Sequence, residues 1–135
     1  MMPPDVADRL RASFARIAAD ADGFAWRFYA ELFAVDPALA GLFPPDLAGQ
    51  HGKFISMLGS IVEAIDQPHR LTTTFAELGR RHAGYRVDEA HYDSVGIALL
   101  RALRDALGAH WDEDMEAAWA TLYGEMSEAM IEGTR

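Results

Sequence analysis

The sequence contains no cysteine among its 135 residues. Disulfides, zinc–thiolate sites and iron–sulfur clusters are therefore excluded. No apolar run approaches the roughly 20 residues that a membrane-spanning helix needs. The N-terminal residues, Met-Met-Pro-Pro-Asp, form neither a basic nor an apolar stretch, so we find no signal peptide. These absences predict a cytoplasmic protein with no membrane partner.

Basic residues are also few, with 12 Lys and Arg against 21 Asp and Glu and a net charge of −9. Because this charge repels nucleic acid and anionic lipid, we expect no nucleic-acid partner. Many of the acids gather near the C-terminus: Asp112, Glu113, Asp114, Glu116, Glu125, Glu128 and Glu132. Such a run is typical of a solvated helix face; an acidic docking surface for a partner is the alternative.

Half of the residues are hydrophobic, and the length suits a single domain spanning residues 1–135. Alanine is abundant and no segment reads as a strand, which predicts an all-α fold. We expect about seven helices, two of them short. The long helices lack sustained heptads, so oblique packing is favoured over a coiled-coil-like bundle.

Turn and capping residues divide the first half of the chain. Asp20-Ala-Asp-Gly23 is typical of a loop. Asp36-Pro37 should open a short helix, with aspartate as N-cap and proline at the first helical position, and Pro44-Pro45 cannot continue it. The next helix should run from about residues 47–50 to Asp66 and be closed by Pro68.

The second half is divided in the same way. Thr74 and Glu77 have capping-box spacing, which predicts that a helix starts there and ends at Gly84. Asp88 can cap the following helix, and Asp112 should start the last one.

One histidine lies on an apolar helical face. Leu71, Phe75, Leu78 and His82 are separated by steps of 4, 3 and 4 residues, so they share one side of a helix. An imidazole at this place is either a core histidine with a satisfied hydrogen bond or a ligand for something buried against that face.

Five segments resemble bacterial single-domain globins of the flavohaemoglobin family. They are Phe28-Tyr29-Ala-Glu-Leu-Phe33, Leu42-Phe43-Pro, Leu78-Gly-Arg-Arg-His82, His91-Tyr92-Asp-Ser-Val-Gly96 and Ala117-Ala-Trp119-Ala-Thr-Leu-Tyr123-Gly124. Their order and spacing match over roughly residues 5–131. The resemblance implies a globin fold, with helices packed obliquely around a haem pocket, and haem b (iron protoporphyrin IX) as the cofactor.

The resemblance also implies roles for three residues. His82 matches the proximal histidine that binds haem iron, and neutral imidazole is a good iron ligand. Phe43 matches the phenylalanine that stacks beside the haem. Tyr29 matches the distal tyrosine, whose phenol would donate a hydrogen bond to bound O₂.

The distal side of the pocket has two candidate registers. The spacing from Phe43 favours Gln50 as the polar residue over the iron, with Phe54 one turn further on. A shift of one residue would put His51 and Ile55 there instead. In the favoured register, Phe54 would crowd the ligand pocket.

Further residues are expected around the haem edge. Lys53, Arg80 and Arg81 are candidate partners of the haem propionates, and Tyr85 and Val87 would line the edge of the pocket. Tyr92 matches a tyrosine that, together with a late glutamate, hydrogen-bonds the proximal histidine in this family. In this sequence the glutamate's position falls near Thr134, and Glu128 and Glu132 are out of register.

The resemblance implies reversible binding of the gases O₂, NO and CO. The alternative is a nitric oxide dioxygenase, which would need a separate reductase because 135 residues leave no room for flavin- and nicotinamide-binding domains. A globin fold that has lost haem and acts as a scaffold is disfavoured, because His82, Tyr29 and Phe43 are all present.

Overall fold

The computed structural model describes residues 3–43, 48–83 and 89–133, with the backbone alone at residues 48, 81–83 and 133. Its helices are α1 (Pro4–Ala18), α2 (Ala21–Val35), α3 (Ala48–Glu63), α4 (Pro68–Ala83), α5 (Glu89–Leu107) and α6 (Glu113–Gly133), with short 3₁₀ helices η1 (Pro37–Leu42) and η2 (Gly108–His110). These ranges contain no strand, so the all-α prediction is confirmed. None of the described helices is long and apolar enough to span a membrane.

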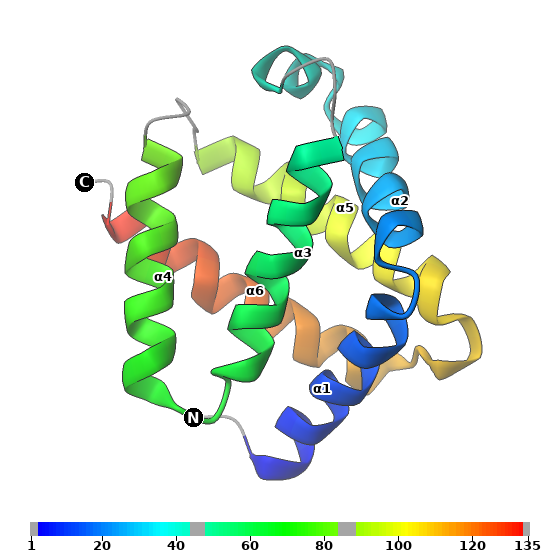
Figure 1. Cartoon of the computed structure of the whole chain (residues 1–135), viewed down its shortest axis with the longest axis vertical. Helices are drawn as coiled ribbons and strands as arrows, with labels where there is room; N and C mark the ends of the chain where they lie inside the picture. Colours follow the sequence, from blue (N-terminus) through cyan, green and yellow to red (C-terminus); the bar gives the residue numbers. More distant parts are fainter. Residues whose placement is uncertain (1–2, 44–47, 84–88, 134–135) are drawn as a thin grey trace.

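The helices cross one another at steep angles (Figure 1). α2 packs most extensively against α5, and α4 against α6, while α3 passes in front of α5 and α6. α3 contacts α1 and α2 closely but makes few contacts with α4. The oblique packing expected from the missing heptads is therefore present, and α3 and α4 stand apart as a loosely joined pair.

The core draws on all six α-helices. The inward face of α6 is buried as its spacing predicts, through Met115, Trp119, Leu122, Met126 and Met130. The indole Nε1 of Trp119 donates a hydrogen bond of 3.0 Å to the hydroxyl of Ser13 on α1. That hydroxyl in turn donates to the Leu10 carbonyl at 2.7 Å, so the buried indole is satisfied.

Of the expectations about aspartates in the first half, the loop at residues 20–23 is wrong, whereas Asp36 takes the expected N-cap position before Pro37. Asp20 accepts a hydrogen bond of 3.2 Å from the Gly23 amide and so caps α2, which makes the expected loop at 20–23 the first turn of that helix. Asp36 precedes η1 but makes no capping bond with its side chain. Its carboxylate instead accepts a hydrogen bond of 3.3 Å from Ser94 on α5.

The capping box expected at Thr74 is also wrong. α4 begins at Pro68, because proline suits the first turn of a helix, where its missing N–H costs nothing. Thr74 lies inside the helix, and its hydroxyl donates to the Arg70 carbonyl at 2.9 Å. The expected end at Gly84 and cap at Asp88 lie outside the described residues. Asp112 caps α6 as expected, accepting from the Met115 amide at 2.8 Å.

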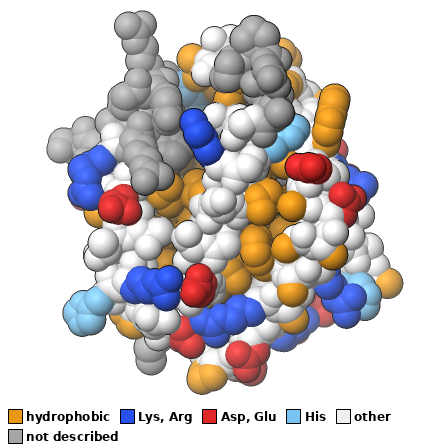
Figure 2. Space-filling model, viewed as in Figure 1, with side chains coloured by type: hydrophobic (Ala, Val, Ile, Leu, Met, Phe, Trp, Pro, Cys, Tyr) orange, Lys and Arg blue, Asp and Glu red, His pale blue; other side chains and the backbone are white. Residues whose placement is uncertain are grey.

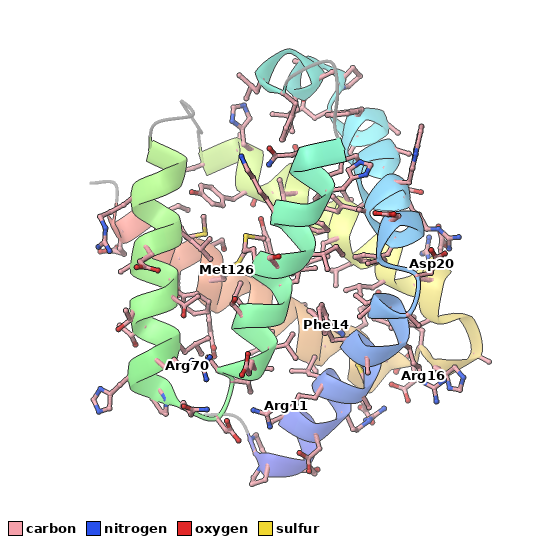
Figure 3. All side chains as sticks on the ribbon, viewed as in Figure 1. Arg11, Phe14, Arg16, Asp20, Arg70 and Met126 are labelled. Atoms are coloured by element: carbon pink, nitrogen blue, oxygen red, sulfur yellow. The ribbon has the colours of Figure 1, made fainter. Side chains whose placement is uncertain are left out.

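Two arginines lie near the corner where the chain passes from α3 to α4, Arg11 and Arg70, both labelled in Figure 3. Arg11 on α1 forms an ion pair of 2.8 Å with Asp66, and its guanidinium donates to the Glu63 carbonyl at 3.1 Å. The hydrogen bond from Arg11 holds the pKa of Asp66 below its usual value. Arg70 lies 3.6 Å from the Glu63 carboxylate. These contacts fix the end of α3 at Glu63, before the expected Asp66.

Candidate functional site

A cavity of about 420 Å³ lies where α2, α3, α4 and α5 meet. Most of the side chains that line it are aromatic or aliphatic, and Tyr29, Gln50 and Lys53 carry polar groups. The complete lining is Phe28, Tyr29, Leu32, Phe43, Gln50, Lys53, Phe54, Met57, Leu78 and Val95. Figure 2 shows hydrophobic side chains on both sides of the column formed by α3. Five residues expected to bind the cofactor line this one cavity: Tyr29, Phe43, Gln50, Lys53 and Phe54.

Tyr29 is the main polar group of the cavity. It is almost completely buried in α2 and forms a side-chain hydrogen bond with Gln50 on α3. Burial raises the pKa of Tyr29 to about 12, and the hydrogen bond with Gln50 opposes this rise. A phenol with the ordinary pKa of 10.0 is already protonated at neutral pH, so Tyr29 has an O–H to donate, and burial extends this to higher pH.

The two distal candidates on α3 make different contacts with Tyr29. Gln50 lines the cavity and hydrogen-bonds the phenol. The imidazole of His51 stacks on the Tyr29 ring, with centroids 5.3 Å apart and planes at 19°. His51 is not among the residues that line the cavity.

Aromatic rings form one wall. Phe54 stacks on Phe28 at 4.1 Å with planes at 13°, and its ring lies 5.8 Å from that of Tyr29. Phe43 meets Tyr29 edge to face at 5.4 Å. Phe54 is thus part of the wall, packed between its aromatic neighbours, and takes up space beside the Tyr29 ring.

The opposite side of the cavity belongs to α4. Leu78 lines it, and His82 follows four residues later in the same helix. The side chains of His82 and Arg81 lie outside the described part of the chain, as do Tyr85 and Val87 altogether. The roles predicted for these four residues remain predictions.

A second cavity of about 540 Å³ opens between α3 and α4. It shares Lys53, Met57 and Leu78 with the first, so the two hollows adjoin. Small side chains of α3 make the space, namely Gly49, Gly52, Ser56 and Ser60. A gap between two loosely joined helices, continuous with an apolar cavity, fits a flat and largely apolar cofactor such as haem.

Tyr92 is buried on α5 but is not part of the cavity lining, whereas Val95, nearly one turn later, is. Burial raises the pKa of Tyr92. The hydroxyl of Tyr123 on α6 donates a hydrogen bond to the Tyr92 carbonyl, which ties α5 to α6. Glu128 is exposed on α6 and Thr134 lies outside the described residues, so the hydrogen-bonding network expected around His82 stays a prediction.

Some residues that line the cavity were not predicted to lie in the site. These are Phe28, Leu32, Met57, Leu78 and Val95. Their helical spacing carried the signal: Leu78 precedes His82 by four residues, and Val95 follows Tyr92 by three.

Comparisons with known proteins agree with this architecture. A model of the globin family matches residues 27–130. The chain is 31% identical to a flavohemoprotein of Deinococcus radiodurans over 135 residues, which cover 97% of this chain and 33% of that protein. It is 28% identical to a neuroglobin of Danio rerio over 119 residues, covering 78% of this chain and 75% of the neuroglobin. The chain spans about one third of the length of the flavohemoproteins it matches. The fold is the expected globin fold, and the chain belongs to the globin family.

Proposed function

We propose that this globin holds haem b between α3 and α4, with His82 as the iron ligand, and reversibly binds O₂, NO and CO. The observation that carries the proposal is the meeting of the Tyr29 phenol and the Gln50 side chain in an apolar cavity. The facing helix, α4, carries His82 in its last turn.

Bound haem would supply iron as the coordination site for a diatomic gas. The chain's own residues would then favour a polar ligand such as O₂. The buried Tyr29 hydroxyl, which is protonated at neutral pH, would donate a hydrogen bond into a space walled by aromatic rings. Gln50 holds the phenol oxygen in position through its own hydrogen bond. A hydrogen bond in such an apolar site is stronger than in water.

Lys53 suits the edge of the same site. Its side chain lines both cavities yet the residue is exposed, so its methylenes can cover the cofactor while the ammonium stays in water. A propionate at that edge would find a charged donor there. Arg81 is proposed as a second donor, with Tyr85 and Val87 along the edge.

Haem titration of the purified protein tests the proposal. One equivalent of haem should give an intense Soret band, and His82→Ala should weaken binding or shift the band. His69→Ala is the matched control, because His69 is exposed at the other end of the same helix. Failure of the wild type to bind haem, or identical titrations for His82→Ala and the wild type, would overturn it.

The distal assignment has its own test. With Gln50 as the distal polar residue, the ferrous protein should be five-coordinate and Gln50→Ala should speed O₂ release. Loss of a six-coordinate ferrous spectrum in His51→Ala, but not in Gln50→Ala, would reverse the assignment in favour of His51.

Nitric oxide dioxygenase activity is the second candidate, favoured by the similarity to flavohemoproteins. One NO, one O₂ and one electron give one nitrate, so each turnover needs a reductase outside these 135 residues. Nitrate formation from NO and O₂ with an added reductase and NADH distinguishes this enzyme from a carrier. Absence of nitrate at saturating reductase leaves gas binding alone.

A further inference from the structure

A groove lies apart from the proposed haem site, at the N-terminal half of α4, where this helix faces α6. Its volume is about 670 Å³. It is lined by Ile65, Pro68, Leu71, Thr72, Phe75, Leu122, Glu125, Glu128, Ala129 and Glu132. It shares none of these residues with the two cavities beside α3.

The crossing of the two helices creates the groove. α4 and α6 touch at Gly79, where an added Cβ would lie only 3.2 Å from the Met130 carbonyl oxygen. Helices that cross obliquely diverge on either side of their contact. The N-terminal half of α4, from Pro68 to Phe75, is the part that lines the groove.

The floor of the groove is apolar and firmly packed. Ile65, Phe75 and Leu122 are buried in the core beneath it. Above them, Leu71 and Ala129 are half-buried and add further apolar surface to the walls. The floor is therefore a preformed surface that apolar side chains of a partner could cover without rearrangement.

The wall formed by α6 is acidic. Glu125, Glu128 and Glu132 follow one another at steps of three and four residues, so all three carboxylates lie on the face of α6 that lines the groove. Among the described residues that line the groove, none is basic. Within the described part of the chain, Glu125 and Glu128 form no ion pair. Carboxylates at this spacing repel one another, and a cationic partner would remove that repulsion.

We propose that the α4–α6 groove docks a basic amphipathic helix of a partner protein. Pro68 to Phe75 spans about 11 Å of α4, room for two anchoring side chains one turn apart on the incoming helix. Lysine or arginine beside those anchors meets Glu125 and Glu128. A second copy of this chain is a poor occupant, because its net charge of −9 repels the same wall.

The test uses a fluorescein-labelled amphipathic peptide built of leucine and lysine, with the same peptide carrying glutamate for lysine as a control. Fluorescence anisotropy should show that the lysine peptide binds the wild type and the glutamate peptide does not. The double variant Glu125→Gln/Glu128→Gln should bind the lysine peptide about 3- to 30-fold more weakly. Binding to the wild type should also weaken as salt is added.

The matched control is the double variant Glu113→Gln/Glu116→Gln. It removes the same charge from the same helix, but both residues lie in the first turn of α6 and outside the groove. Its affinity should equal that of the wild type. Equal weakening in the two double variants would mean that only net charge matters, and would overturn the proposal.

Hydrogen exchange locates the bound peptide independently. The proposal requires protection in residues 68–75 and 122–132, and protection elsewhere contradicts it. Neither readout involves haem, so a failure of haem binding and a failure of this docking site are separate results.

Discussion

At the level of single residues, the proposed O₂ binding depends most on the Tyr29 hydroxyl. If it donates a hydrogen bond to bound O₂, Tyr29→Phe removes one bond worth about 1–3 kcal/mol, and O₂ dissociation should become roughly 5- to 150-fold faster. Stopped-flow displacement of O₂ by CO measures this rate.

Tyr123→Phe is the control for that substitution. It removes a part-buried tyrosine hydroxyl that donates to the Tyr92 carbonyl, and Tyr123 does not line the cavity. Its O₂ dissociation rate should match the wild type. An unchanged rate in Tyr29→Phe would mean that the phenol does not face the ligand.

At the scale of helices, the contact between α4 and α6 depends on Gly79. In Gly79→Ala the new Cβ would lie 3.2 Å from the Met130 carbonyl and 3.3 Å from its Cα, so the two backbones must separate by a few tenths of an ångström. Overpacking costs about 1–3 kcal/mol, and the higher helix propensity of alanine offsets about 0.5–1 kcal/mol of it. We therefore expect a net loss of stability, which urea unfolding monitored by circular dichroism would measure.

Gly124→Ala on α6 is the matched control, because an added Cβ there meets nothing within 4 Å. Alanine is the better helix former, so this variant should gain about 0.5–1 kcal/mol. Two variants of equal stability would show that the helices tolerate separation at Gly79.

Helix patterns predicted part of this architecture and missed the rest for identifiable reasons. The inward stripe of α6 followed from its spacing, because burial repeats with the helix period. The start of α4 at Pro68 did not follow from the sequence. Thr74 and Glu77 have the spacing of a capping box whether or not a helix begins there, and a proline such as Pro68 can either end one helix or begin the next.

Contacts between segments far apart in the chain could not be predicted from the sequence. Ser13 with Trp119 and Arg11 with Asp66 depend on which helices meet, and no local pattern encodes that. The choice between Gln50 and His51 is of the same kind. Neighbouring residues of a helix point in directions about 100° apart. Only the position of α2 determines that Gln50 lines the cavity and that His51 stacks on Tyr29.

At the scale of the whole molecule, buried phenols predict loss of stability in alkali. Burial raises the pKa values of Tyr29, Tyr92 and Tyr123 above the ordinary 10.0, that of Tyr29 to about 12. Between about pH 10 and 12 the unfolded chain releases protons that the folded chain keeps, so the free energy of unfolding falls as pH rises.

Each such phenol contributes a slope of at most about 1.4 kcal/mol per pH unit. Urea unfolding at a series of pH values should show this decline, and Tyr29→Phe should make it shallower. A free energy of unfolding that is constant from pH 9 to 12 would contradict the burial of these groups.

We propose above all that this globin binds O₂ reversibly at haem held in the cavity beside Tyr29. The most direct test is the absorption spectrum of the purified, haem-loaded ferrous protein before O₂ is added, after it is added, and after it is removed. We expect an intense Soret band that shifts when O₂ is added and returns to its first position when O₂ is withdrawn. A spectrum that does not respond to O₂, or immediate and complete oxidation to the ferric form, would contradict it.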